Sequence, residues 1–292
     1  MKKNLITISL FIFIGFTGCN DSFPVPEIEM IHIRAGTFNM GYVGVIYAEP
    51  VHEVTITKDY YMSKYPITVG DFRIFAQNTH YKTLAERGYG GKVFIELAEH
   101  EIKDANWKNP YYEQNDRHPV VLISWLDAIE YCNWLSKINN LTPVYKISGR
   151  NITPNWNANG FRLPTEAEWE YACRAGTTTL YYTGYTITDN DAWFRSNSGF
   201  GTNEVGLKPP NPWGLHDMHG NIWEWVWDWR DNSYTPGDKV NPTGVPNGGP
   251  YRASRGGSWI NVERRLNSAE RSYGTPNYRT NLLGFRVVRT YQ

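Results

Sequence analysis

The sequence predicts a single compact domain of the α+β class with long irregular loops. The chain has 292 residues, of which 41% are hydrophobic, and this supplies enough apolar surface for one large core. Apolar residues recur at helical spacing only before Gly176, and beyond it short aromatic runs alternate with clusters of Asn, Gly, Pro and Thr. This order of elements excludes a doubly wound βαβ sheet. No internal repeat and no linker rich in proline or serine divides the domain.

The charge balance and the aromatic content narrow the class of function. Lysine plus arginine and aspartate plus glutamate each number 29, so the formal net charge is zero and the molecule as a whole has no field that attracts nucleic acid. We therefore expect no nucleic-acid partner. The 12 tryptophans and 20 tyrosines, with 26 glycines and 17 prolines, favour an aromatic-packed fold rich in turns over a helix bundle.

The first residues have the features of an export signal. Lys2 and Lys3 are followed by an apolar stretch, Leu5 to Phe16. This stretch has the length of a signal peptide and is too short for an ordinary membrane-spanning helix. Small residues then precede Cys19, an arrangement that resembles the bacterial lipoprotein signal, in which the cysteine becomes the acylated first residue. The alternative is an ordinary secretion signal with an incidental cysteine.

On the lipoprotein interpretation, residues 1–18 are a signal peptide that is removed. Acyl chains on Cys19 would hold the protein at a membrane surface of a bacterial cell envelope, exported from the cytoplasm, without a spanning helix. Residues 19–27 contain two prolines and polar residues and would form a short tether. The folded domain would then comprise residues 28–292.

Short strands and a helix are predicted for the segment between residues 30 and 79. Met30 to Met40 is the first strand-like run. Glu53 to Ile56 and Tyr60 to Met62 alternate in hydrophobicity as short strands do, and we expect them to form a strand pair. A helix should follow behind a cap at Thr68, because apolar residues recur there at helical spacing.

Two further helices carry clear start signals. Ser124 caps the first of them, and Thr165 caps the second in a capping box with Glu168. Cys132 and Cys173 lie on the apolar faces of these two helices, where we expect them to be small buried hydrophobic residues. With Cys19 acylated, they allow one disulfide at most and no multi-cysteine zinc site.

The segment from Gly220 to Trp229, GNIWEWVWDW, predicts a strand with one face made entirely of indole rings. Its tryptophans alternate with other residues at a period of two, at positions Trp223, Trp225, Trp227 and Trp229. Glu224 lies on the opposite face, between Ile222 and Val226. It must be exposed, paired with a base or bound to a cation, because an unpaired buried charge is costly.

Oxygen ligands for calcium could gather around this strand. Asp217 and Glu224 would supply carboxylates, and the backbone near Gly220 and Ile222 would supply carbonyl groups, which together form the oxygen shell that calcium prefers. The sequence therefore makes these four residues a candidate calcium site.

Other metal and enzyme motifs find little support. His216 and His219 bracket Asp217, but a third ligand of suitable spacing is missing, so a solvated histidine pair is favoured over a transition-metal site. The sequence contains no GxSxG, HExxH, GxxxxGK[ST] or GxGxxG motif in a suitable strand–helix context. Hydrolase, zincin, P-loop and dinucleotide-binding activities are therefore not indicated.

Four segments stand in a characteristic order along the chain. They are FRLPTEAEWEYACRAG at Phe161–Gly176, NPWGLHDMHGNIWEWVWDW at Asn211–Trp229, RGGSW at Arg255–Trp259 and GFRVVR at Gly284–Arg289. Together they resemble the formylglycine-generating enzyme, or sulfatase-modifying factor, family, and the resemblance extends from about Ile31 to Arg289. It implies that family's fold, a compact relative of C-type lectin domains with little regular secondary structure.

The family's copper chemistry is not expected here. In its enzymes, a cysteine in a sulfatase is oxidised to formylglycine by molecular oxygen, with Cu(I) held by two cysteines just after the GGS motif. The matching positions in this chain are Asn261 and Leu266. Neither side chain supplies the thiolate that Cu(I) needs, so whether the protein is an enzyme at all is left open.

Further family positions also differ. The two helix cysteines match residues that form disulfides in some relatives, but the apparent partner positions hold Ser268 and Val287. The place of the family's pocket asparagine is taken by Leu282, with Asn281 one position away.

Some site positions are retained. The family's calcium pattern matches the four residues that the Trp-rich segment already indicates. Trp223 and Ser258 match residues that line the active-site cavity, and with Asn261 they are our candidates for a remaining pocket, although core packing is the other role open to them. Four arginines around this loop could bind an anionic group or form ordinary surface ion pairs, namely Arg255, Arg264, Arg265 and Arg271.

These observations lead to one hypothesis of function and one alternative. We expect an envelope lipoprotein that keeps the fold as a binding or assembly module without copper, with an envelope protein, a peptide or a glycan as partner. The alternative is a diverged sulfatase-maturation oxidase. Relatives that join sulfur to histidine derivatives use iron in a separate helical domain, and their HxxxHxE motif is absent from this sequence.

Overall fold

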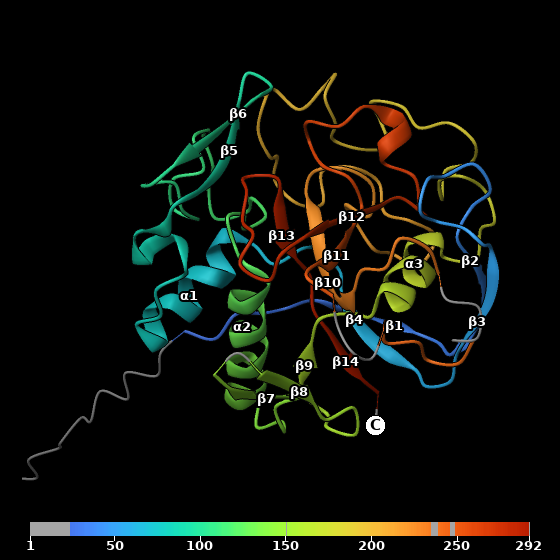
Figure 1. The fold of residues 1–292 in the computed structure, drawn as a ribbon, viewed down its shortest axis with the longest axis horizontal. Helices are drawn as coiled ribbons and strands as arrows, with labels where there is room; N and C mark the ends of the chain where they lie inside the picture. Colours follow the sequence, from blue (N-terminus) through green and yellow to red (C-terminus); the bar gives the residue numbers. More distant parts are fainter. Residues whose placement is uncertain (1–23, 150, 235–238, 246–248, 292) are drawn as a thin grey trace, which may run out of the picture.

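The protein is described by a computed structural model that covers residues 24–149, 151–234, 239–245 and 249–291 (Figure 1). The predicted signal peptide and Cys19 lie outside the described residues, as does the tether before Pro24. None of the helices in the described parts has the length and apolar composition needed to cross a bilayer.

The fold is α+β, as predicted, and the described residues form two small sheets, three hairpins and three α-helices joined by long loops. The helices are α1 (Val69–Thr79), α2 (Trp125–Ile138) and α3 (Glu166–Arg174), with a π-helical turn η1 (Ala85–Tyr89) and a 3-10 turn η2 (Glu263–Arg265). The hairpins are β2 (Gly36–Met40) with β3 (His52–Ile56), β5 (Gly91–Ile95) with β6 (Ala98–Ile102), and β7 (Tyr145–Ser148) with β8 (Asn151–Pro154).

The two four-stranded sheets bring together segments that are far apart in the chain. The first has the order β1 (Met30–Ile33), β4 (Tyr60–Ser63), β14 (Val288–Thr290) and β9 (Phe161–Arg162). The second has the order β12 (Arg271–Gly274), β11 (Arg252–Arg255), β10 (Trp223–Trp229) and β13 (Leu283–Phe285). Because β4 pairs with both β1 and β14, the first and last strands of the described chain belong to the same sheet.

The strand pairing differs from the prediction in one respect. The run from Met30 to Met40 is two strands, separated where the Ala35 N–H donates to Asp59 Oδ1 at 2.8 Å. As a result β4 pairs with β1, whereas β3 pairs with β2, so the two later strands do not pair with one another. Alternation of hydrophobicity locates strands but does not specify their partners.

All three helices begin at the predicted caps. The hydroxyl of Thr68 accepts a hydrogen bond from the Asp71 N–H at 3.1 Å, and the Asp71 carboxylate accepts one from the Thr68 N–H at 3.0 Å. The same reciprocal capping box occurs at the starts of α2 and α3. These boxes satisfy N–H groups that a helix leaves unpaired at its first turn.

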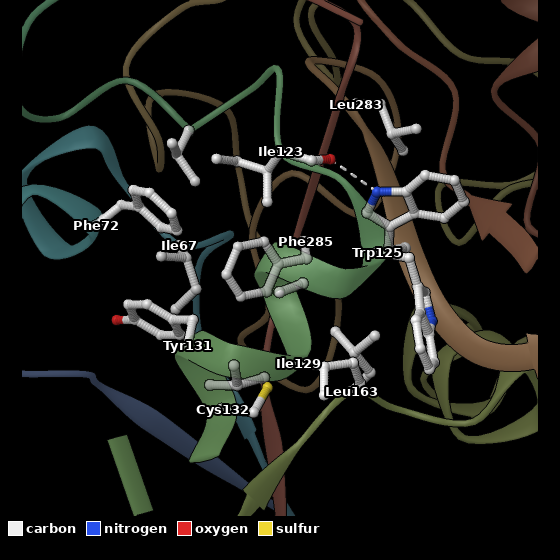
Figure 2. Packing of buried hydrophobic residues seen from close by; sticks show 14 of the residues in the cluster. Ile67, Phe72, Ile123, Trp125, Ile129, Tyr131, Cys132, Leu163, Leu283 and Phe285 are labelled. Atoms are coloured by element: carbon white, nitrogen blue, oxygen red, sulfur yellow. Dashed lines mark hydrogen bonds between the residues drawn. The ribbon is translucent and has the colours of Figure 1, made fainter. Parts of the chain in front are cut away.

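The main core lies where α1 and α2 meet the strands of the second sheet. Figure 2 shows Phe72 of α1, Tyr131 of α2 and Phe285 of β13 within one cluster, together with Cys132 and Trp125. The Tyr131 ring lies 5.8 Å from that of Phe72 and 5.3 Å from that of Phe285, between centroids. Aromatic packing therefore provides much of the core, as the composition predicts.

Candidate functional site

Strand β10 is the centre of the candidate site, because it lies between β11 and β13 and carries the Trp-rich motif. Trp223, Trp225 and Trp227 are buried in the main core. The Trp227 ring stacks on Tyr145 at 5.2 Å, and the Trp225 indole donates to the Ile123 carbonyl at 2.9 Å. The predicted indole face of this strand is therefore packed against the core.

Glu224 lies on the other face of β10 and is paired with Arg286. The guanidinium donates through Nε to Glu224 Oε2 at 2.7 Å and through Nη2 to Oε1 at 2.8 Å. The Trp169 indole of α3 donates to Oε2 at 2.7 Å. Both charged side chains are fully buried. Of the three states that the sequence allows for this carboxylate, the structure shows the pair with a base.

Asp217 is the second carboxylate of the predicted calcium site. It is buried, and its Oδ2 accepts from the Gly206 N–H at 2.8 Å, while Asn221 Nδ2 lies 3.4 Å from Oδ1. Burial raises the pKa of this carboxyl above its ordinary value of 3.8. Its hydrogen-bond donors are therefore neutral groups, whereas those of Glu224 include a guanidinium, and Arg286 acts on Asp217 only as a neighbouring charge.

Gly220 and Ile222 form the turn that leads into β10. Gly220 has a φ of 78° and donates to the Gly256 carbonyl at 2.9 Å, and a Cβ at this position would lie 2.2 Å from the Trp193 carbonyl oxygen. Glycine is required here by both the backbone angle and the close approach. The Ile222 N–H donates to the Gly220 carbonyl at 2.8 Å, which tightens the turn.

The side chains as arranged do not form an oxygen shell for calcium. Both oxygens of Glu224 accept hydrogen bonds from Arg286, and calcium would have to compete with that cation. Within the part of the chain that is described, no three histidine, cysteine, aspartate or glutamate side chains are grouped as metal ligands. Calcium at Asp217, Gly220, Ile222 and Glu224 stays a prediction.

Ser258 and Asn261, two of the three pocket candidates, bind one another. The Ser258 N–H and hydroxyl both donate to Asn261 Oδ1 at 2.9 Å, and the Asn261 N–H donates to the Ser258 carbonyl at 2.9 Å. Ser258 is fully buried. Asn261 thus closes the turn after the GGS motif, at the first position that matches a family copper ligand.

The second such position, Leu266, lies in a small apolar cluster. Its side chain is fully buried beside Tyr181, Ile187 and Phe194. Its Cδ2 would lie 2.4 Å from a Cβ placed on Gly257, so the glycine of the GGS motif is needed for this packing. Neither matching position offers a ligand for a soft metal ion.

Trp223, the third pocket candidate, is 7% exposed and packs in the core. Its backbone N–H donates to the Leu282 carbonyl at 2.8 Å. Asn281, next to Leu282, joins two other segments through its amide, which pairs with both backbone groups of Phe94 and donates to the Pro110 carbonyl at 3.0 Å. The contacts of Trp223 and Asn281 therefore hold the fold together.

A hollow of about 730 Å³ lies elsewhere, against α3 and the β2–β3 hairpin. The three pocket candidates do not line it. Its walls are formed largely by Phe38, Tyr42, Tyr171 and Trp213. No local pattern in the sequence indicates this hollow, because its walls come from three separate segments that meet only in the fold.

The two cysteines on helices are buried and free, as predicted. Burial raises the pKa of Cys132 far above its ordinary value and that of Cys173 to about 12. The apparent disulfide-partner positions, Ser268 and Val287, are both buried and hold no thiol. Cys132 and Cys173 are therefore inert core residues and not substitutes for copper ligands.

The prediction of a solvated histidine pair is wrong for His219. This side chain is 1% exposed, stacks on Tyr182 at 4.4 Å between centroids, and accepts at Nε2 from the Tyr182 N–H at 3.2 Å. Burial lowers its pKa to about 3, so it is neutral. His216 is partly buried and donates from Nδ1 to the Lys208 carbonyl at 2.8 Å. The prediction is wrong because Tyr182, 37 residues away in the chain, covers His219.

Two of the four arginines around the site form buried rather than surface ion pairs. Arg271 donates to both oxygens of Glu166 at 2.6 and 2.8 Å, and Arg255 donates to Glu170 from a fully buried guanidinium. Arg265 is exposed, but its partner Glu270, at 2.8 Å, is buried, so this pair lies only partly at the surface. Arg264 is exposed.

These buried pairs were missed although the sequence holds a signal for them. Glu166, Glu170 and Arg174 recur every four residues along α3, which places them on one helix face. Arg174 donates to Glu170 at 2.9 Å, and the pKa of Glu170 is lowered despite its burial, by Arg174 and Arg255. A row of charges on a helix that packs against a sheet indicates internal partners.

The fold and the GGS loop together define a domain of the sulfatase-modifying-factor type. A family model described as "Sulfatase-modifying factor enzyme 1-like domain" matches residues 19–291, and the chain belongs to this family.

Similar proteins have different names. The mouse formylglycine-generating enzyme is 30% identical over 308 residues, which is 91% of this chain and 76% of the enzyme. Chaperone protein LppX of Paenibacillus barcinonensis is 30% identical over 270 residues, covering 76% of this chain and 91% of LppX. The solved structure of Treponema denticola variable protein 1 has a TM-score of 0.71 and 29% identity, and the match covers 90% of this chain and 95% of that one.

Proposed function

We propose that this protein is a lipid-anchored envelope member of the family that works as a binding or assembly module and lacks copper-dependent oxidase activity. One observation carries the proposal. The two positions that match the family's copper ligands hold Asn261 and Leu266, and both side chains have other roles in the structure.

Those other roles make a hidden copper site implausible on chemical grounds. The Asn261 amide oxygen accepts two hydrogen bonds from Ser258, and Leu266 is surrounded by apolar side chains. A Cu(I) site needs soft sulfur ligands. The thiols of Cys132 and Cys173 belong to separate core clusters, and their raised pKa values keep them protonated.

The comparisons support an assembly role without assigning one. LppX is named a chaperone and is matched over most of its length, so one relative with this domain has a name that denotes assistance to another protein. The mouse enzyme matches at the same identity, which keeps the oxidase as the alternative. The choice between them rests on the two site positions and not on overall similarity.

The oxidase alternative is tested by incubating the purified protein with a peptide carrying a sulfatase motif, copper and oxygen. We expect no mass change in the peptide's cysteine. The matched control is the double variant Asn261→Cys/Leu266→Cys, which restores thiols at both positions. Formation of the aldehyde by the wild-type chain would overturn the proposal, whatever the variant does.

The binding role is tested in the envelope itself. Crosslinking of the anchored protein in intact cells, followed by mass spectrometry of the adducts, should give a reproducible protein, peptide or glycan partner. If repeated crosslinking gave no stable adduct, the module hypothesis would lose its support. Metal analysis of the same material should show no stoichiometric copper.

Calcium is a separate hypothesis with its own test. If calcium bound at Asp217 and Glu224, unfolding of the purified chain would shift to higher temperature with added calcium and to lower temperature with a chelator. Equal unfolding temperatures in both would contradict calcium binding at these residues.

A further inference from the structure

The start of the described chain is fixed against helix α1. The Pro24 carbonyl accepts a hydrogen bond from Asn78 Nδ2 at 3.1 Å, in the last turn of the helix. Pro26 is buried, and Ile28 packs against the main core. The chain therefore reaches the folded domain at the carboxyl end of α1.

The distance from this point to the lipidation site is short. Cys19 precedes Pro24 by five residues, and a fully extended chain of this length spans about 17 Å. A domain of this size is about 45 Å across. Figure 1 shows α1 at one edge of the molecule and β2 and β3 at the opposite edge. An acyl chain on Cys19 would therefore bring the α1 edge, and not the β2–β3 edge, to the membrane.

The surface next to this point combines cations with aromatic rings. Lys82 and Arg87 are exposed, and Tyr89 is 66% exposed. Arg87 lies over the Tyr81 ring at 5.4 Å. In the described parts of the chain no carboxylate lies within ion-pair distance of Lys82 or Arg87, although Glu130 and Arg87 interact electrostatically at longer range. Lysine, arginine and tyrosine are the residues that proteins place at the head-group level of a bilayer.

A hollow of about 480 Å³ opens on the same surface. It is lined by the side of α1 and by the segments that follow it, including Arg73, His80, Tyr81, Lys82, Trp107 and Lys108. Lys108 pairs with Glu86 at 2.7 Å and lies over Trp107 at 5.1 Å, and Arg73 pairs with Asp116. Of the three basic side chains Arg73, Lys82 and Lys108 in this lining, Lys82 is therefore the one without an ion pair among the described residues, so its charge is available to an anion from outside the protein.

We propose that the surface formed by His80, Lys82, Arg87, Tyr89 and Lys108, which we name the α1–η1 surface, lies against the membrane and contacts the phosphates of anionic phospholipids. The proposal rests on the acylation of Cys19 that the proposed function includes. It adds an orientation, because it leaves the β2–β3 edge and the 730 Å³ hollow beside it pointing away from the bilayer.

The orientation is tested with single fluorescent labels on the full chain. Gln77→Cys places a label on the exposed side of α1, and Val43→Cys, at a position that is 76% exposed after β2, is the matched control. Each protein is purified from membranes and placed in vesicles of equal parts phosphatidylcholine and phosphatidylglycerol that contain a head-group spin-labelled lipid. We expect the label at position 77 to be quenched several-fold more than the label at position 43.

The head-group contact is tested by reversing charge. Lys82→Glu with Arg87→Glu should lower the quenching at position 77 by about twofold or more in these vesicles, because each basic residue near an anionic surface favours contact. Lys58→Glu with Lys239→Glu, two exposed lysines beside β3, should leave it unchanged. In vesicles of phosphatidylcholine alone, both pairs should behave as the parent.

Each outcome separates the proposals. A mass showing unmodified Cys19 overturns the lipid anchor and the orientation with it. An acylated chain with equal quenching at positions 77 and 43 overturns the orientation alone. Greater quenching at position 77 that the reversal of Lys82 and Arg87 does not lower overturns the contact with anionic phospholipid.

Discussion

Replacing Arg286 with methionine tests the conclusion that Glu224 is held by an internal ion pair. The change removes a fully buried guanidinium and keeps an apolar side chain of similar length. Glu224 loses hydrogen bonds of 2.7 and 2.8 Å and keeps the one from Trp169. The carbonyls of Ser63 and His216 lose their donors at 3.0 and 2.8 Å.

The expected loss in the free energy of unfolding is about 3–5 kcal/mol, the usual effect of removing one partner of a buried ion pair. A domain has about 5–15 kcal/mol of stability in total, so the variant should unfold at far lower urea concentration. The control is Lys92→Met, which breaks the half-exposed pair between Lys92 and Glu99. Its loss should stay within about 1 kcal/mol.

Urea unfolding followed by tryptophan fluorescence measures both variants. The double variant Glu224→Gln/Arg286→Met removes the stranded charge as well, and it should be more stable than Arg286→Met alone by about 1–3 kcal/mol. If Arg286→Met costs no more than the surface control, the pair does not stabilise the fold. If added calcium raises the urea midpoint of the wild-type chain, in which Arg286 is still present, calcium binds there and our assignment of Glu224 to an internal ion pair is wrong.

Three further predictions concern the surroundings of the site. The pKa of His219 is lowered from 6.5 to about 3, so its contribution to stability is present above pH 6.5 and is lost as the pH falls toward 3. In His219→Gln the urea midpoint should therefore fall less steeply with decreasing pH over this range than in the wild-type chain. An equally steep fall in both proteins would contradict the assignment. Cys132 and Cys173 should react with a thiol reagent only in urea, because both are buried with raised pKa values, and labelling of the native chain within minutes would show otherwise. Leu266→Ala should lower the free energy of unfolding by about 2–5 kcal/mol, and a loss below about 1 kcal/mol would mean that the position is not packed as described.

The sequence was sufficient to predict the fold class and the helices, because their signals are local. Thr68, Ser124 and Thr165 each cap a helix through atoms that lie three residues apart in the chain, so spacing alone is enough to recognise the cap. The indole face of β10 follows from a period of two in the same way. Such patterns need no knowledge of what the element packs against.

The errors arose where partners are distant in the chain. Arg286 reaches Glu224 across 62 residues, and Arg271 reaches Glu166 across 105. A single sequence shows each charge but not its partner, and for Glu224 it left exposure, pairing with a base and binding of a cation all open, with calcium as the candidate cation. The burial of His219 was missed for the same reason, since Tyr182 covers it from 37 residues away.

The structure explains how the fold can persist without the family's copper ligands. The turn after the GGS motif is closed by hydrogen bonds between Ser258 and Asn261, and Leu266 fills an apolar cluster, so neither position needs a metal to be held in place. The strand beside the turn is fixed by the Glu224–Arg286 pair, which also requires no ion. The scaffold is therefore stabilised independently of the oxidase chemistry, and this independence is what a binding module built on the same fold requires.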